Sequence, residues 1–559
     1  MDLLYNIIKK IKQQSMLNIF KNSFYFRLVF GFIFSYIIIS VIFCIYYDVV
    51  SLKIPYLLVI DTLRPITSLF SDYQYSSILQ SSYIWLLSFI IIGFLPSILF
   101  RNLSNKSKSK DGFISRNKDI LNLGLNFFNG ITLGKVRNKI LKTDHPLSSL
   151  IVAPSGTGKT AGFIIPTLLD SNNSIICYDI KGELYDKTHK VRANMGHKIL
   201  ILDPTDDNSI KFNPLAQNLL PKNKIHYDSY IGDIAKILFP ESSNSGNGNY
   251  FVNSARSIFQ TFSLFLVLQN GYTSINQVTN TIFSSENIID ISKEKLEEMK
   301  ESSKLTKVKE RLIAKLQNDF NKIEPFFIKK DDKPSDVLST LSTTLSDFDS
   351  IDIIDIMDVK KSSITISDLR SEKITIYIKI DFNSQKRLEK LASLFFQSIA
   401  NQIMSNQPNE NNRKITFILD EFGNIGKLPT LIKATTLSRG YNFNQIFVLQ
   451  DLEQLSSIYS REEKEILISN TAYKVILRQN NRQTAEYISK LIGNIKVNKT
   501  TTNKDKNNKI QSTSNYEQEK PIISSQELMS LDSSTSILIV QSGGSFGTVK
   551  CKVPYYFKS

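Results

Sequence analysis

Apolar residues follow two kinds of pattern along the chain. Residues 28–47 and 81–100 carry no charged side chain, and each run has the length of about twenty residues that a helix needs to cross a bilayer. Further along, short runs rich in Ile, Leu and Val recur with helical patterns between them. The first pattern predicts two transmembrane helices. The second predicts an α/β fold with a mostly parallel sheet.

Lysine and arginine residues predict how these two helices are oriented. Basic residues are frequent in residues 1–27 and immediately after residue 100, whereas only Lys53 and Arg64 lie between the two runs. Positive charge favours the cytoplasmic side. We therefore expect both termini in the cytoplasm and a short outer loop at 48–80. The alternative is a buried apolar hairpin, although uncharged runs of this length are rare in soluble domains.

Eight apolar runs predict the strands of the cytoplasmic part. They are 148–153, 174–179, 198–203, 373–380, 414–420, 445–450, 473–479 and 536–541. Residues 223–346 show helical periodicity with charged faces and predict an all-α domain. This domain would interrupt a nucleotide-binding domain made of 101–222 and 347–559. The polar stretch 496–520 predicts a mobile loop, which serves either as a solvated linker or as a contact to DNA.

Composition narrows the chemistry without choosing it. The chain has 559 residues, and 68 Lys and Arg residues against 52 Asp and Glu residues give a formal charge of +16. This charge favours anionic partners, either nucleic acid or phospholipid. Three cysteines and four histidines lack the spacing of a disulfide framework or a zinc site. Catalysis through a thiol pair or zinc is therefore not expected.

A phosphate-binding loop follows the first predicted strand of the cytoplasmic part. Its residues are Ala153, Pro154, Ser155, Gly156, Thr157, Gly158, Lys159, Thr160 and Ala161. Glycines in such a loop allow backbone N–H groups to turn toward phosphate at the start of a helix. We expect Lys159 to reach the β- and γ-phosphates of ATP and the Thr160 hydroxyl to ligate Mg²⁺. Pro166 should shorten or kink the helix that follows.

The strand at 414–420 supplies the second part of an ATP site. It ends in Asp420 and Glu421, at the edge of the sheet where ligands bind in doubly wound folds. Asp420 would hold the metal ion, and Glu421 would orient and deprotonate the attacking water. The alternative is a solvated acid pair at the end of an ordinary strand. The presence of the phosphate-binding loop favours the metal-binding interpretation over this alternative.

Three further residues are candidates with less specific signals. Gln450 ends the next predicted strand and would sense the γ-phosphate, or it is an ordinary glutamine at a strand end. Arg439 has no acidic helical partner in the preceding ten residues, so it is either an arginine finger that acts on a neighbouring subunit or a surface charge. Asp179 faces the same crevice, but the sequence assigns it no chemical step.

These residues resemble the TraG-type coupling proteins of bacterial type IV secretion and conjugation systems. The resemblance rests on the two apolar runs, the loop at 153–160 and the segments Asp179-Ile-Lys-Gly-Glu-Leu-Tyr185, Phe212-Asn-Pro-Leu215, Leu419-Asp-Glu-Phe-Gly423, Ser438-Arg-Gly-Tyr441 and 524–540. It implies a RecA-like nucleotide-binding domain, an all-α domain and a homo-hexameric ring in the inner membrane with ATP between subunits. It also implies that Arg439 acts across the interface and that Gln450 reads the γ-phosphate. Ala153 and the insertion after Ile495 depart from the family pattern.

The leading hypothesis is therefore a membrane ATP hydrolase that uses ATP and Mg²⁺. It would deliver a relaxase–DNA complex or protein effectors to the components of a type IV secretion channel, with the outer loop 48–80 in the periplasm. The alternative is a receptor or scaffold that nucleotide only stabilises. Glu421 and Arg439 favour the motor, because a scaffold needs neither a water-activating base nor a cation that acts across an interface. The sequence leaves open whether the cargo is DNA, protein or both.

Overall fold

The computed structural model of the chain describes residues 112–241, 248–301, 306–328, 335–380, 385–504, 510–542 and 544–558. The predicted transmembrane helices, 28–47 and 81–100, and the loop between them lie outside these residues. Among the residues described, one helix, α10 (Gly248–Asn270), is long and apolar enough to cross a membrane by its length and composition. Its side chains Phe259, Phe262 and Phe265 are buried in the protein core.

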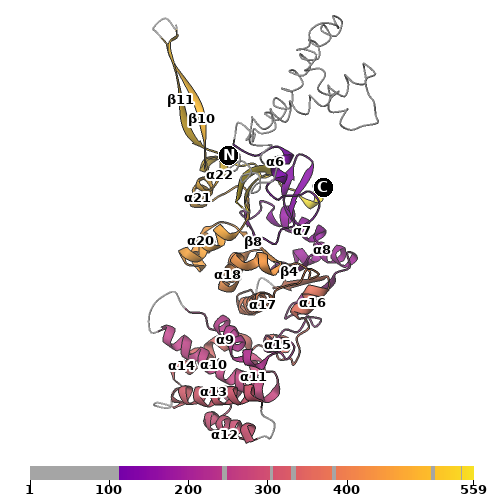
Figure 1. Cartoon of the computed structure of the whole chain (residues 1–559), viewed down its shortest axis with the longest axis vertical. Helices are drawn as coiled ribbons and strands as arrows, with labels where there is room; N and C mark the ends of the chain where they lie inside the picture. The colour runs from indigo at the N-terminus through magenta and orange to yellow at the C-terminus, as the bar shows by residue number, and fades with distance from the viewer. Residues whose placement is uncertain are drawn as a thin grey trace, which may run out of the picture. The chain divides into compact units, whose positions relative to one another are not determined.

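An eleven-stranded sheet has the strand order β2-β1-β13-β12-β9-β3-β8-β7-β4-β6-β5. Two of its strands, β4 and β8, are labelled in Figure 1. The strands from β9 to β5 run parallel to one another. Their bounds are β3 (Ser149–Val152), β4 (Ser174–Asp179), β5 (Lys198–Leu202), β6 (Ile374–Lys379), β7 (Ile415–Leu419), β8 (Phe443–Leu449) and β9 (Tyr473–Ile476). Each of these strands lies within, or largely overlaps, one of the predicted apolar runs.

Both faces of the parallel strands are covered. In β4, Ile176 and Tyr178 belong to the hydrophobic core on one face, whereas Ile175 and Cys177 belong to the core on the other face. A strand buried on both faces needs apolar residues at every position, which explains the continuous apolar runs. The helices packed around the sheet are α6 (Asn117–Leu121), α7 (Ile165–Asp170), α8 (Glu183–Asn194), α16 (Ile366–Ser371), α17 (Gln385–Ser405), α18 (Pro429–Leu437), α19 (Glu453–Ile458), α20 (Arg461–Asn470), α21 (Arg482–Ile492) and α22 (Ser525–Met529).

Four antiparallel strands extend the sheet beyond β9. They are β12 (Thr535–Ser542), β13 (Ser545–Lys552), β1 (Ile131–Val136) and β2 (Lys139–Thr143). The sequence predicted β12 but not the other three. Those strands are mixed in polarity; β13, for example, reads Ser-Phe-Gly-Thr-Val-Lys-Cys-Lys, with exposed positions among the buried ones. Such strands lack the long apolar run that identified the parallel strands.

Between β5 and β6 the chain is helical. The helices α9 (Tyr227–Leu238), α10, α11 (Ile275–Ile282), α12 (Ile288–Glu301), α13 (Lys307–Ile323), α14 (Asp336–Leu345) and α15 (Ile351–Met357) are called the helical block below. Figure 1 shows them gathered together, and the described residues between Leu202 and Ile374 contain no strand. One continuous hydrophobic core joins the block to the sheet.

Asn213 ties the two ends of the helical block together. Its side-chain amide donates to the carbonyl of Thr273 at 2.7 Å and to the carbonyl of Val359 at 2.8 Å, and its Oδ1 accepts from the N–H of Leu215 at 2.9 Å. Its own N–H donates to Ser362 Oγ at 2.9 Å. The residue is fully buried. The Phe-Asn-Pro-Leu segment therefore forms the junction at which the chain enters and leaves the block.

The predicted loop at 496–520 is corrected by the structure. The strands β10 (Asn494–Lys504) and β11 (Ile510–Pro521) pair with each other in an antiparallel hairpin, which forms a separate two-stranded sheet. The prediction relied on the scarcity of apolar residues. A hairpin, however, also gains from cross-strand hydrogen bonds, from the β-propensity of its Thr residues and from paired charges, such as Lys496 and Glu517 at 3.2 Å.

Candidate nucleotide-binding site

The loop at 153–159 connects β3 to a helix in the geometry that a phosphate requires. Gly156 and Gly158 have φ values of 78° and 84°, a conformation that glycine adopts without a steric cost. Thr157 Oγ1 donates to the carbonyl of Pro154 at 2.6 Å and closes the turn. The helix opens with a π turn, Thr160–Ile164, before α7. Pro166, which has no N–H for the usual bond to the preceding turn, explains this irregular start.

The predicted acid pair lies directly against this loop. Lys159 Nζ is 2.6 Å from Glu421 Oε1, and Thr160 Oγ1 donates to Asp420 Oδ2 at 3.0 Å. Glu421 has a left-handed backbone with φ of 60°, which is uncommon for a residue with a side chain. The strand β7 thus ends in a sharp turn that places both carboxylates beside the phosphate-binding loop.

Gln450 joins the same group of side chains. Its strand, β8, lies between β3 and β7 in the sheet, so its carboxyl end falls between the loop and the acid pair. Gln450 Nε2 donates to Glu421 Oε2 at 2.8 Å. Both carboxylate oxygens of Glu421 are therefore held, one by an ammonium group and the other by an amide.

The two acids have opposite shifts in pKa. Burial raises the pKa of Asp420 to about 6, although Lys159 and the Thr160 hydroxyl oppose this effect. Burial would also raise the pKa of Glu421, but the hydrogen bonds from Lys159 and Gln450 outweigh it, and the net pKa is lower than usual. Glu421 is thus held as a carboxylate, whereas Asp420 is close to protonation near pH 6.

The donor set fits a magnesium ion. Asp420 Oδ1 is buried and has no hydrogen-bond partner within the part of the chain that the structure describes, so one lone pair remains available to a cation. The Thr160 hydroxyl lies next to it. Carboxylate and hydroxyl oxygens are the ligands that Mg²⁺ prefers, completed by water and substrate phosphate. Asp420 and Thr160 are therefore the residues that would hold it.

A cavity of about 460 Å³ opens at this edge of the sheet. The phosphate-binding loop and the acid pair line one part of it, and Asp179, Lys181 and Asn424 line the rest. Lys181 is exposed and lowers the pKa of Glu421 by its charge. The cavity therefore combines backbone N–H groups, two lysines and four carboxylates, those of Asp179, Glu183, Asp420 and Glu421. This set suits a polyanion accompanied by a divalent cation.

Asp179 has a structural partner that the sequence did not reveal. Its Oδ2 accepts from the N–H of Tyr185 at 2.8 Å, in the first turn of α8. Burial raises the pKa of Asp179 to about 6 despite this hydrogen bond. The residue therefore caps a helix at the wall of the cavity.

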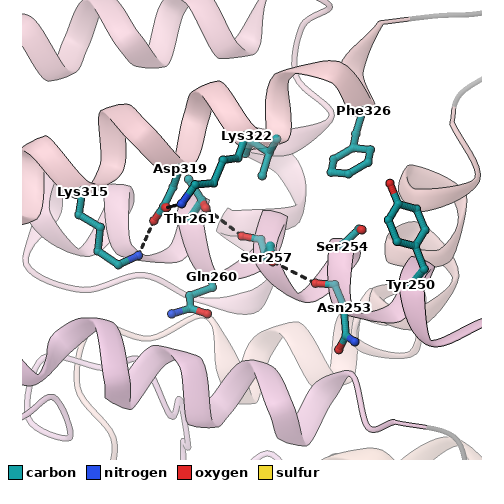
Figure 2. A pocket seen from close by; sticks show the side chains of 11 residues that line it. Tyr250, Asn253, Ser254, Ser257, Gln260, Thr261, Lys315, Asp319, Lys322 and Phe326 are labelled. Atoms are coloured by element: carbon teal, nitrogen blue, oxygen red, sulfur yellow. Dashed lines mark hydrogen bonds and ion pairs between the residues drawn. The ribbon is translucent and has the colours of Figure 1, made fainter.

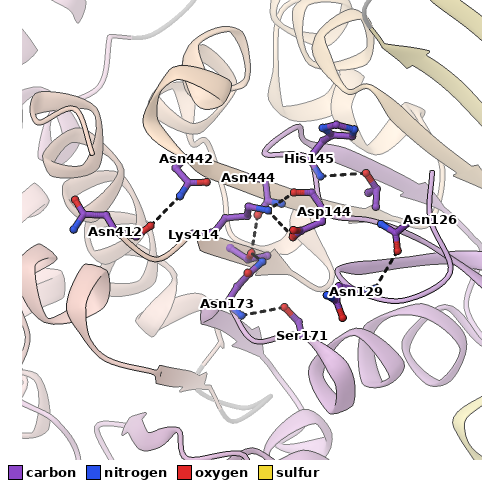
Figure 3. Close-up of polar contacts among 12 residues, drawn as sticks. Asn126, Asn129, Asp144, His145, Ser171, Asn173, Asn412, Lys414, Asn442 and Asn444 are labelled. Carbon is purple, nitrogen blue, oxygen red and sulfur yellow. Dashed lines mark hydrogen bonds and ion pairs between the residues drawn. The ribbon is translucent and has the colours of Figure 1, made fainter. Parts of the chain in front are cut away.

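Arg439 lies away from these residues. It precedes β8, whereas Gln450 follows β8, and the seven-residue strand separates them by about 20 Å. At the amino end of β8, Asn442 and Asn444 take part in the polar contacts of Figure 3, among them Asn442 Nδ2 to the carbonyl of Asn412 at 3.1 Å. Arg439 is exposed, and no ion pair links it to another described residue.

A second hollow, of about 360 Å³, lies between α10 and α13 in the helical block (Figure 2). Its lysines are already paired: Lys322 Nζ is 3.3 Å from Asp319 Oδ1, and Lys315 contacts both Asp319 and Asp228. The other polar groups are hydroxyls and amides. This hollow lacks the glycine-rich turn of the first cavity, so it has no comparable site for phosphate.

Comparison with known proteins places this site in a family. The sequence profile of the family described as Type IV secretory system Conjugative DNA transfer matches residues 102–559. The chain belongs to this family. Among its relatives are Protein VirD4 of Agrobacterium fabrum, 28% identical over 364 residues, and the conjugal transfer protein TraG of Escherichia coli, 23% identical over 374 residues. The alignments cover 62% and 63% of this chain but 49% and 56% of those relatives, so the chain spans about half of their length.

This member of the conjugative DNA transfer family also resembles a solved structure. The bacterial conjugative coupling protein TrwB superposes with a TM-score of 0.57 over 79% of this chain and 92% of that chain, at 16% identity. This likeness concerns the fold, a mixed α/β fold of RecA type with a large, mostly parallel sheet. The predicted family is confirmed, and so is the predicted α/β class with a mostly parallel sheet. The two transmembrane helices and the inserted all-α domain stay predictions.

For this family member, the sequence predicted most of the residues that line the cavity but not all of them. The structure brings Lys159, Thr160, Asp420, Glu421 and Gln450 together and leaves Arg439 at the other edge. Asn424 was missed, although its place four residues after Asp420 on a tight turn was a usable signal.

Proposed function

We propose that this protein is a membrane coupling ATPase of a type IV secretion or conjugation system. It would hydrolyse ATP while it recruits relaxase–DNA complexes or protein effectors and delivers them to the secretion channel. One observation carries the proposal: Lys159 and Thr160 of the phosphate-binding loop contact Glu421 and Asp420 at 2.6 Å and 3.0 Å. This arrangement brings phosphate-binding, metal-binding and water-activating groups into one cavity.

The residues would act in a defined order. Backbone N–H groups of 156–161 and the ammonium group of Lys159 bind the phosphates, and Lys159 gives up its contact with Glu421 as it does so. The Glu421 carboxylate is then available to accept a proton from water, while Gln450 keeps hold of its other oxygen. Bound Mg²⁺ would neutralise charge that develops on the phosphate oxygens.

Solved structures of TrwB support the nucleotide part of the proposal. That protein has been solved in complex with ADP and Mg²⁺ and with non-hydrolysable analogues of ATP and GTP. TrwB shares the fold of this chain. We therefore assign ATP as substrate and Mg²⁺ as its cofactor.

The wider architecture is proposed from the apolar runs of the sequence and from the family to which the chain belongs. Two transmembrane helices at 28–47 and 81–100, with a periplasmic loop at 48–80, would anchor the chain in the inner membrane with both termini in the cytoplasm. The segments 101–222 and 347–559 would form the nucleotide-binding domain, interrupted by an all-α domain at 223–346. Six copies would form a ring in which Arg439 acts on the nucleotide of a neighbour.

The Glu421→Gln variant tests the proposal. The purified chain should bind ADP with wild-type affinity and lose about 100-fold or more of its phosphate release from ATP, because glutamine keeps the contact to Gln450 but cannot accept a proton. Glu462→Gln, a change at a fully exposed carboxylate on α20, is the control and should leave the rate unchanged.

Undiminished turnover in Glu421→Gln would remove this residue from its role. A wild-type chain that binds nucleotide and releases no phosphate in the presence of cargo would instead favour a receptor or scaffold that nucleotide stabilises.

A further inference from the structure

The residues that follow β13 pack against the phosphate-binding loop. A Cβ placed on Gly158 would lie 2.5 Å from Cε1 of Tyr555, and one placed on Gly162 would collide with Cγ1 of Val553. Neither glycine can therefore carry a side chain unless this segment moves. The register explains the contact, because Lys552 pairs with Thr535 of β12, beyond the point where Ile537 pairs with Ile476 of β9. The segment thus emerges at the same edge as the loop.

Sheet order places this segment on the side opposite the acid pair. From β3, the strands β8 and β7 lie on one side and carry Gln450, Asp420 and Glu421 at their ends. The strands β9, β12 and β13 lie on the other side and lead to Tyr555. Because Glu421 and Asp420 take the end of the triphosphate that reacts, the nucleoside has to extend away from them. That direction leads toward the segment 553–557.

This segment presents stacked aromatic rings. The rings of Tyr555 and Phe557 are 5.3 Å apart between centroids and inclined by 26°, and Tyr556 meets Phe557 edge-on at 5.3 Å. Tyr555 is half-buried and donates its hydroxyl to the carbonyl of Ser533 at 3.2 Å. Phe557, in contrast, is 60% exposed. An anchored ring thus supports a second ring that faces solvent.

We propose that Phe557, supported by Tyr555, stacks on the base of the nucleoside triphosphate bound at the phosphate-binding loop. The inference rests on the proposed function, since it adds a base subsite beside the same phosphate-binding loop, against which Tyr555 packs at Gly158. Stacking is the interaction that an exposed ring offers to a purine, and it tolerates different bases because each has a π face. The subsite therefore adds affinity for the nucleoside without strong selection between purines.

The test compares ATP with tripolyphosphate, which has the phosphates but no base. Dissociation constants of the full chain for both are measured by isothermal titration calorimetry. Phe557→Ala should weaken ATP about 5- to 30-fold and leave tripolyphosphate within about twofold, and Phe557→Trp should retain ATP binding. The control is Phe546→Ala. Phe546 is 50% exposed and lies at the start of β13, at the end of the strand away from Phe557.

Each outcome decides the inference. Unchanged ATP affinity in Phe557→Ala would overturn the base subsite and leave the proposed function intact. Equal weakening of ATP and tripolyphosphate would also overturn it, because the segment would then only shape the phosphate-binding loop. A wild-type chain that binds neither ligand would overturn both proposals. Photolabelling with 8-azido-ATP gives a second readout, and it should mark the peptide that contains Tyr555 and Phe557 in the wild-type chain.

Discussion

Three carboxylates at one edge of the sheet differ in their readiness to ionise. Asp179 and Asp420 have pKa values raised to about 6 by burial, whereas contacts with Lys159 and Gln450 lower the pKa of Glu421. The raised values show that the fold holds negative charge here at a cost to its own stability. A bound cation would relieve that cost, as expected of a site that is complete only with its ligand.

Asp179 allows this cost to be measured apart from metal binding. The native state holds a proton on Asp179 up to about pH 6 and the unfolded chain only up to about 3.8, so ionisation of this group lowers the free energy of unfolding as pH rises between these values. Asp179→Asn keeps an oxygen for the N–H of Tyr185. Its free energy of unfolding relative to wild type should rise by about 1–3 kcal/mol between pH 4.5 and pH 8.

Denaturant unfolding of both chains at the two pH values checks this expectation. Asp207→Asn, at an exposed carboxylate outside α8, is the control. A difference between Asp179→Asn and wild type that stays constant from pH 4.5 to 8 would contradict the raised pKa.

At the scale of elements, the junction around Asn213 should determine the stability of the helical block. Asn213→Ala removes a side chain that bonds to Thr273, Val359 and Leu215 and leaves buried polar groups unpaired. We expect a loss of about 2–4 kcal/mol in the free energy of unfolding. Asn280→Ala, on the exposed side of α11, is the control.

Hydrogen exchange followed by mass spectrometry distinguishes a local effect from a global one. The helices α11 and α15 flank the junction and should lose protection first, ahead of β3 and β4. Protection lost equally across the sheet and the helical block would contradict a local role for Asn213.

The hairpin of β10 and β11 pairs only with itself in the sheet arrangement, so its outer part should be dispensable for folding. Lys499 and Tyr516 are partners in register, and a two-residue Asn-Gly turn can join such a pair. Replacing 500–515 by Asn-Gly should leave the thermal midpoint within about 2 °C and nucleotide affinity unchanged. A clear fall in the midpoint, measured by circular dichroism, would show that the outer hairpin supports the core.

These elements show what the sequence could and could not predict. The parallel strands were predictable because burial on both faces demands continuous apolar runs, and β4 matches its predicted run at both ends. The strands β1, β2 and β13 were not, since partly exposed strands accept lysine, threonine and glycine. The site was predictable for Lys159, Asp420 and Glu421, because the carboxyl ends of parallel strands, and the loops that follow them, lie at the same edge of the sheet. Tyr555 depends on which strand lies beside which, and local pattern carries no such information.

At the scale of the whole molecule, Arg439 lies far from the nucleotide-binding cavity of its own chain. From this distance we predict how subunits cooperate in an assembly. Arg439→Ala and Glu421→Gln should each abolish ATP turnover alone. If Arg439 serves a neighbour, a random 1:1 mixture should recover about a quarter of the wild-type rate, since that share of interfaces has both residues intact. Phosphate release from co-assembled subunits measures this. A mixture as inactive as either variant would contradict a shared site.

The order of the sheet also governs how the protein can be made. The strand β3 ends at Val152, but its two neighbours, β8 and β9, begin at Phe443 and Tyr473. On the ribosome, β3 is synthesised long before either partner strand exists. Until then its apolar faces are exposed and prone to aggregation. In a nascent or truncated chain that lacks β8 and β9, the phosphate-binding loop consequently lacks the neighbouring strands that complete the cavity. The proposed ATP hydrolysis would therefore start only after nearly complete translation.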